Sequence, residues 1–214
     1  MKYSYVYVLD SYADWELGYV TAELESRRYF RSPETHYPVR TVSATKEPIR
    51  TMGGLTIFPD TTPDELTPEN VAVLLLPGED TWHEPQHAPI IAKTKELLDS
   101  HSNIGAICGA TVALANAGLL DKRPHTSNSL DYLKHACPHY HGASFYEDKK
   151  AVADANLVTA NSAGGLLFAR YILARLGVFS EDTLAEWYNF FQTGQTQHFL
   201  ALMQTLPKQG PTEG

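Results

Sequence analysis

The stretch from residue 104 to residue 117 constrains the fold of this chain more than any other. It reads as a short apolar strand, then Cys108, then two small residues, then a helix. A strand-to-helix turn this tight crowds the backbone around its central residue, so small side chains must flank it, and here they are Ala106, Gly109 and Ala110. The pattern predicts a nucleophile elbow with sulfur in place of oxygen; the alternative is a cysteine buried in the core.

The thiol of this elbow should be reactive. Cys108 would sit at the first turn of a helix, where unpaired N–H groups and the helix dipole favour a thiolate. We therefore expect a depressed pKa for Cys108 and faster alkylation than at Cys137, the only other cysteine. A disulfide would consume the elbow, so we expect free thiols and a cytoplasmic protein.

The order of apolar and polar segments predicts an α/β fold. Val71–Leu76 is a continuous apolar run, as expected for a parallel strand that is covered on both faces. Predicted strands alternate with predicted helices along most of the chain, which favours a mostly parallel sheet with helices on both faces. We expect one domain over residues 1–206 and a disordered tail at 207–214.

The remaining elements follow from periodicity, caps and turn residues. We expect strands at 3–9, 39–43 and 104–107, hairpins at 49–58 and 152–158, and helices at 15–28, 89–101, 129–136, 166–176, 181–192 and 196–206.

Three residues follow the predicted parallel strands at their carboxyl ends. Glu16 comes after the first strand, Gly78 after Val71–Leu76, and Cys108 after the next strand. Function collects at this edge of such sheets, so neighbouring strands would bring all three residues into one small pocket. The alternative for Glu16 is an ordinary acidic residue that complements the dipole of its helix.

Composition argues against several classes of partner. The 214 residues carry a net charge of −8 without a cluster of Lys or Arg, which argues against binding to nucleic acid or an anionic membrane. No apolar run approaches the roughly 20 residues that span a bilayer. We expect a small-molecule substrate and a homodimer, with no cofactor and no metal ion in the site.

Four motifs resemble one known family. They are Ala-Ile-Cys-Gly-Ala at 106–110, Leu-Pro-Gly at 76–78, Asp-Trp-Glu at 14–16 and Ala-Gly-Leu-Leu at 117–120. Together they resemble the DJ-1/PfpI superfamily, over roughly Lys2 to Gly177. The resemblance implies a flavodoxin-like three-layer sandwich, related to class I glutamine amidotransferases, and in many members a homodimer.

The resemblance also implies roles for individual residues. It implies Cys108 as the reactive thiol and Glu16 as a carboxyl hydrogen-bonded to its sulfur. It implies backbone N–H groups near Gly78 and Gly109 as an oxyanion hole. Members of the superfamily include amidases, intracellular proteases, glyoxalase- or deglycase-like enzymes and redox-responsive proteins.

The sequence departs from the superfamily at the general base. Some relatives carry His directly after the nucleophile, where this chain has Gly109; others carry it after Thr-Thr, where Thr126-Ser127 is followed by Asn128. His125 is the best remaining candidate for a catalytic histidine. The late His-x-Glu pair of glutamine amidotransferases is missing, which argues against glutaminase activity.

Further polar residues are candidates for the pocket: Glu79, His83, Asn128 and Asn161. For Asn161-Ser162 the favoured interpretation is an ordinary N-cap of the following helix. A metal ion could also bind at a cluster of four residues, and the sequence leaves this open. They are His135, Cys137, His139 and His141, and their spacing matches no standard zinc site.

Two functions fit these residues. The first is a cysteine-dependent hydrolase, amidase or glyoxalase-type enzyme that acts on a small carbonyl substrate through Cys108, with His125 or water handling the proton. The second is a stress protein that uses the same cysteine as a sensor of oxidants.

Overall fold

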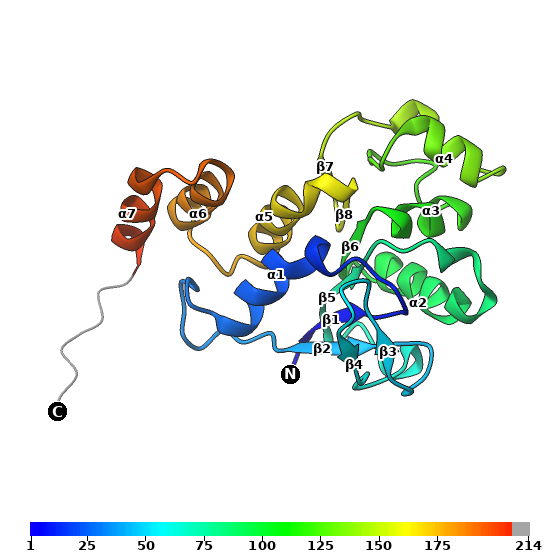
Figure 1. Cartoon of the computed structure of the whole chain (residues 1–214), viewed down its shortest axis with the longest axis horizontal. Helices are drawn as coiled ribbons and strands as arrows, with labels where there is room; N and C mark the ends of the chain where they lie inside the picture. Colours follow the sequence, from blue (N-terminus) through cyan, green and yellow to red (C-terminus); the bar gives the residue numbers. More distant parts are fainter. Residues whose placement is uncertain (207–214) are drawn as a thin grey trace.

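The computed structural model describes residues 1–206, and the tail expected at 207–214 lies outside the described residues. A six-stranded sheet runs through the centre of the molecule in the order β2-β1-β5-β6-β8-β7 (Figure 1). Neighbouring strands are parallel, except that β7 is antiparallel to β8. The strands are β1 (Tyr3–Tyr7), β2 (Val39–Val42), β5 (Val71–Leu76), β6 (Asn103–Ile107), β7 (Ala151–Asp154) and β8 (Leu157–Ala160).

Helices cover both faces of this sheet, and a small separate hairpin joins β3 (Ile49–Arg50) to β4 (Thr56–Ile57) (Figure 1). The helices are α1 (Asp14–Ser26), α2 (Ala88–Asp99), α3 (Gly109–Asn116), α4 (Leu130–Ala136), α5 (Gly165–Leu176), α6 (Glu181–Thr193) and α7 (Thr196–Thr205). The prediction of an α/β sandwich with a mostly parallel sheet is thus confirmed.

The alternation of side chains along the strands builds one core on each face of the sheet. In β1, Tyr5 and Tyr7 join the core beneath α2 and α3, whereas Val6 and neighbouring Val8 join the core beneath α1 and α5. Strand β5 is buried along its whole length. Its continuous apolar run follows directly, because both of its faces pack against helices.

Several predicted boundaries differ from the structure: β1 ends at Tyr7 and not at residue 9, α1 spans Asp14–Ser26 and not 15–28, and α2 spans Ala88–Asp99 and not 89–101. The hairpin expected at 152–158 exists, but its second strand continues through Thr159 and Ala160, which the prediction placed in the segment that opens the next helix. The difference arises because β8 lies inside the sheet, where it pairs in parallel with β6 as well as antiparallel with β7.

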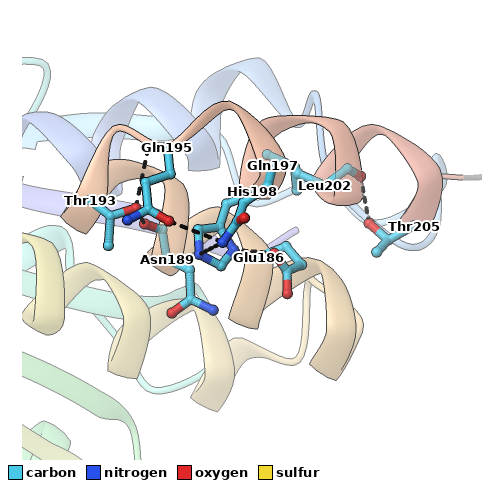
Figure 2. A network of polar contacts seen from close by, with 8 residues as sticks. All are labelled: Glu186, Asn189, Thr193, Gln195, Gln197, His198, Leu202 and Thr205. Carbon is cyan, nitrogen blue, oxygen red and sulfur yellow. Dashed lines mark hydrogen bonds and ion pairs between the residues drawn. The ribbon is translucent and has the colours of Figure 1, made fainter.

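The last two helices, α6 and α7, lie at the end of the molecule away from α4 (Figure 1). Ser180 caps α6, since its hydroxyl accepts a hydrogen bond from the N–H of Thr183 at 3.1 Å. His198 of α7 contacts Glu186 of α6 at 2.7 Å, within the polar network in Figure 2. The indole of Trp187, a residue of α6, is fully buried.

Within residues 1–206, no helix is both long enough and apolar enough to cross a membrane.

Candidate active site

Cys108 occupies a backbone conformation that few residues adopt. Its φ of 56° and ψ of −124° form the sharp turn between β6 and α3, and its N–H donates to the carbonyl of Ala160 at 2.9 Å. Such a strained turn persists only where its surroundings enforce it, and it typically presents a reactive side chain. The elbow that the small residues predict is therefore present in the structure.

Two glycines make room for this turn. A Cβ atom on Gly109 would collide with the carbonyl oxygen of Glu79. A Cβ atom on Gly78 would lie 2.6 Å from both the Cβ of Cys108 and a carboxyl oxygen of Glu16. The structure thus brings Glu16, Gly78 and Cys108 together at the carboxyl edge of β1, β5 and β6, as the strand order requires.

Glu16 is a buried carboxyl with one free oxygen. Only 1 % of the residue is exposed, and Oε2 accepts a hydrogen bond from the N–H of Gly78 at 2.6 Å. Oε1 is buried and has no hydrogen-bond partner among residues 1–206. Burial raises the pKa of Glu16 above its usual value, although the hydrogen bond from the N–H of Gly78 and the neighbouring thiol of Cys108 oppose the shift. A proton shared between Glu16 and the Cys108 thiol would therefore be bound at Oε1, the carboxyl oxygen without a hydrogen-bond partner within residues 1–206.

The sulfur itself accepts two hydrogen bonds. Ser162 Oγ donates to Cys108 Sγ at 2.8 Å, and Asn128 Nδ2 donates at 3.3 Å. The side chain of Asn128 also orders Ser162, because Asn128 Oδ1 accepts from the N–H of Ser162 at 2.9 Å. Asn128 Oδ1 lies 3.1 Å from the hydroxyl oxygen of Ser162 and is the alternative acceptor for the single proton of that hydroxyl. These donors form a small network that points at the sulfur.

Sequence reasoning chose Asn128 for the pocket but missed Ser162. The Asn161-Ser162 pair was interpreted as a helix cap, yet Asn161 makes no side-chain cap hydrogen bond. The Oδ1 atom of Asn161 is buried without a partner among residues 1–206, and its N–H donates to the carbonyl of Lys150 at 3.0 Å. The only available signal was a position directly after a strand, at the edge where sites collect.

The expectation of an acidic thiol is not supported. Burial is the largest influence on the pKa of Cys108 and raises it, while the hydrogen bond from Ser162 lowers it and the nearby charge of Glu16 raises it again. The helix N-terminus was expected to dominate, but the sulfur is partly removed from water and shares its site with a second acid. Cys137 is buried as well, and burial raises its pKa to about 11.

The imidazole of His125 is hydrogen-bonded to groups other than the Cys108 thiol. It is fully buried, with Nδ1 2.8 Å from the carbonyl of Arg123 and Nε2 2.6 Å from the hydroxyl of Tyr140. A carbonyl only accepts, so Nδ1 carries the proton and Nε2 accepts from Tyr140. Burial also lowers the pKa of His125. Both ring nitrogens are engaged elsewhere, and we remove His125 from the candidate catalytic residues.

The backbone N–H groups of Gly78 and Gly109, the two expected donors to an oxyanion, differ in whether they are free to donate to a substrate. The N–H of Gly78 is already donated to Glu16. The N–H of Gly109 has no acceptor within residues 1–206, as is usual for the first residue of a helix. Gly109 is therefore the better placed donor for a developing negative charge.

Glu79 and His83 line a cavity of about 200 Å³ that begins at Gly109. His83 is exposed at its rim, and the N–H of Thr81 donates to a carboxylate oxygen of Glu79. The lining of this cavity does not include Cys108, so a place for Glu79 and His83 in the pocket of the thiol stays a prediction.

No metal centre is assembled in the described part of the chain. Residues 1–206 contain no group of three or more His, Cys, Asp or Glu side chains that could hold an ion. Within the cluster near residue 137, Cys137 is buried and its thiol donates to the carbonyl of Val112 at 3.5 Å. Both cysteines are free thiols.

Comparison with known proteins agrees with this fold. A model of the DJ-1/PfpI family matches residues 2–175. The chain is 46 % identical over 202 residues to a Bacillus subtilis protein named uncharacterized protease YoaZ, covering 94 % of this chain and 96 % of that one.

Solved structures give the same result. A thiJ/pfpI family protein from Bacillus anthracis is 47 % identical, with a TM-score of 0.93 over 97 % of this chain and 98 % of that chain. The DJ-1 superfamily protein Atu0886 from Agrobacterium tumefaciens is 30 % identical, with a TM-score of 0.78 over 91 % of this chain and 100 % of that chain.

Proposed function

Since this chain belongs to the DJ-1/PfpI family, we propose that it is a cysteine-dependent enzyme that acts on a small carbonyl compound. The observation that carries the proposal is the set of groups around one sulfur. Cys108 Sγ sits on a strained elbow, accepts from Ser162 and Asn128, and lies beside the buried carboxyl of Glu16. Related Bacillus subtilis proteins are named as uncharacterized proteases, which supports a hydrolase-like role.

Glu16 and Cys108 act as a pair of acids that share one negative charge. Two anions this close in a largely buried site repel each other, so both cannot ionise at neutral pH. When Glu16 is ionised, it can take the thiol proton as the sulfur attacks, which makes it a general base. When the charge is on sulfur, the donors Ser162 and Asn128 stabilise the thiolate.

The first step is addition to the carbonyl carbon. Cys108 Sγ forms the new bond, the thiol proton passes to Glu16, and the carbonyl π electrons move to oxygen. The N–H of Gly109 stabilises that oxyanion. Glu16 then returns its proton, either to this oxygen when the substrate is an aldehyde or to the leaving group when it is an acyl compound.

Small substrates fit this site better than peptides. Both nitrogens of His125 are engaged with other groups, and Cys108 Sγ has Ser162 and Asn128 as its hydrogen-bond partners within residues 1–206. In cysteine hydrolases that cleave peptides, a histidine usually protonates the leaving amine, and within residues 1–206 the sulfur has no histidine as a hydrogen-bond partner. The substrate that we propose is therefore an aldehyde or an activated acyl compound.

Turnover assays test the proposal directly. We expect wild-type protein to convert methylglyoxal, a chromogenic ester or a chromogenic amide, and Cys108→Ala to reduce the rate to that of buffer. Cys137→Ala is the matched control, because it removes the buried thiol and should retain the activity. Equal rates in wild type and Cys108→Ala would refute the proposal.

A redox sensor is the second candidate. The donors around Cys108 could equally hold the oxygens of an oxidised sulfur, and Cys137 is buried and forms no disulfide with it. Absence of turnover together with selective oxidation of Cys108 by peroxide, read by mass spectrometry, would favour this function. The homodimer, the single domain and the cytoplasmic location stay predictions.

A further inference from the structure

The elbow offers one backbone donor to an oxyanion, where such sites usually combine two. The N–H of Gly78 is donated to Glu16 Oε2 at 2.6 Å, which leaves the N–H of Gly109 as the backbone donor. A second donor to the carbonyl oxygen is therefore to be sought among the side chains that contact the sulfur.

The side-chain amide of Asn128 turns its nitrogen towards the sulfur. The other end of this amide lies 2.9 Å from the backbone nitrogen of Ser162, whose N–H only donates, so that end is the oxygen Oδ1. The NH₂ group is then the end that lies 3.3 Å from Cys108 Sγ. The hydrogen bond from Ser162 thus fixes which way the amide faces.

This NH₂ group has one N–H more than the sulfur accepts. It carries two N–H bonds, and its hydrogen-bond partner within residues 1–206 is Cys108 Sγ. Asn128 is exposed, so a substrate can reach the second N–H. The hydroxyl of Ser162, in contrast, has a single proton, for which Cys108 Sγ and Asn128 Oδ1 are the two acceptors. Of the two side chains, Asn128 is the one with a donor to spare.

Two buried hydroxyl groups connect the segment before Asn128 to the elbow. Thr111 Oγ1 lies 2.6 Å from the carbonyl oxygen of Cys108 and 2.7 Å from Ser127 Oγ. A carbonyl only accepts, so Thr111 donates to Cys108 and Ser127 donates to Thr111. Asn128 is therefore held relative to the elbow at two points, through Ser127 in the backbone and through Ser162 at its amide.

Negative charge moves from sulfur to oxygen during addition to a carbonyl. As Cys108 Sγ bonds to the carbonyl carbon, the sulfur loses its charge and becomes a weak acceptor, like a thioether. The oxygen that gains the charge is attached to the carbon that the sulfur has just bonded. A donor that already contacts the sulfur is therefore close to this oxygen.

We propose that the side-chain amide of Asn128 is a catalytic donor that stabilises the oxyanion together with the N–H of Gly109. This inference rests on the proposed function, because it takes addition of Cys108 to a carbonyl as the reaction. In the free enzyme the amide donates to the sulfur, and in the tetrahedral intermediate it donates to the oxyanion.

Two reagents that react with the same sulfur separate this role from stabilisation of the thiolate. With p-nitrophenyl acetate, Cys108 Sγ bonds to the carbonyl carbon, an oxyanion forms, and its collapse expels p-nitrophenolate. With methyl methanethiosulfonate, Sγ bonds to the sulfur of the methylthio group and methanesulfinate leaves, so no carbonyl takes part. In both reactions the thiol proton is lost to Glu16 or to solvent. Peptide mass spectrometry gives both rates at Cys108 at one pH, and the first divided by the second is the acylation ratio.

Asn128→Ala should lower the acylation ratio by about 10- to 100-fold, because one hydrogen bond to the oxyanion is lost. A less stable thiolate would slow both reactions, so that effect cancels in the ratio. Asn128→Asp keeps an oxygen acceptor for the N–H of Ser162 and should lower the ratio as well. An unchanged ratio in these two variants would overturn the inference.

Two further variants serve as controls. Ser162→Ala removes the other donor to the sulfur and should change both rates in the same proportion, which leaves the acylation ratio as in wild type. Asn116→Ala makes the same chemical change at an exposed asparagine of α3 and should alter neither rate. A decrease in the ratio in either control as large as that in Asn128→Ala would overturn the inference.

The outcomes separate this inference from the proposed function. A protein that turns over carbonyl compounds through Cys108, with the same acylation ratio in wild type and Asn128→Ala, keeps the function and loses the inference. A protein whose Cys108 is acetylated without further turnover loses the enzymatic function. A lower ratio in Asn128→Ala would then still identify the amide as the donor to the oxyanion.

Discussion

Helix α1 carries two buried glutamates in very different surroundings. Glu16 and Glu23 are each 1 % exposed and lie seven residues apart, which is about two turns of helix. Glu23 is fully partnered: Arg28 donates to both carboxylate oxygens, with Nε at 2.9 Å from Oε2, and Trp187 Nε1 donates to Oε1 at 2.8 Å. Glu16 has one backbone donor and an unpartnered oxygen.

The difference shows how the same side chain serves structure in one place and chemistry in the other. Glu23 ties α1 to α6, because Arg28 offsets its charge and its Oε1 accepts a hydrogen bond from the indole N–H of Trp187 in α6. Glu16 lacks a cationic partner within residues 1–206, so burial favours its protonated form, which suits the role of proton carrier that we propose for it next to Cys108. The following predictions test this contrast.

The largest effect should come from removal of the charge on Glu23. Glu23→Gln should lower the free energy of unfolding by about 2 kcal/mol, the usual worth of buried hydrogen bonds to a charged group. Glu16→Gln should cause no comparable loss, because Glu16 has no cationic partner within residues 1–206 and a Gln oxygen can still accept from the N–H of Gly78. Urea unfolding followed by far-UV circular dichroism measures both.

Glu25→Gln is the matched control on the same helix. Glu25 is exposed, so the same chemical change there should alter the free energy of unfolding by no more than about 0.5 kcal/mol. Equal losses at positions 16 and 23 would contradict the contrast between the two carboxyls.

A smaller effect should appear in the pH dependence of stability. The pKa of Glu16 is raised above 4.5 in the folded chain, so the folded state holds this proton more tightly than the unfolded state. The resulting stabilisation is complete below pH 4.5 and is lost as the pH rises through the higher folded pKa.

The comparison with Glu16→Gln isolates this contribution. The free energy of unfolding of wild type, relative to the variant, should decrease from pH 4 to pH 8 and should not increase anywhere in that range. A parallel pH dependence in the two proteins would mean that Glu16 ionises normally in the folded state.

The smallest effect concerns the sulfur. Ser162→Ala removes one donor to Cys108 Sγ, which should raise the midpoint of the pH profile of alkylation by about 0.5 to 1 unit, since a neutral hydrogen bond contributes about 1 kcal/mol. Iodoacetamide labelling at a series of pH values measures it.

Ser180→Ala serves as the control, because Ser180 caps α6 rather than contacting the sulfur. It should leave the labelling profile of Cys108 unchanged, as should Glu23→Gln. A profile that shifts equally in Ser162→Ala and Ser180→Ala would point to loosening of the fold and not to a lost donor.

The sequence by itself determined the sheet, the elbow and the meeting of Glu16, Gly78 and Cys108. These depend on local rules: continuous apolar runs form buried parallel strands, small residues allow the elbow, and the carboxyl ends of parallel strands share one edge. Each rule depends either on residues that are near one another in the chain or on a strand order for which few alternative topologies exist.

Tertiary structure alone decided which side chains surround the sulfur and which are engaged elsewhere. Ser162 reaches Cys108 from 54 positions away, Trp187 reaches Glu23 from 164, and His125 is held by Tyr140. The burial that raises the pKa of Cys108 is likewise a property of the packed site. Such contacts depend on the packing of distant segments and on side-chain rotamers, which no local pattern in the chain specifies.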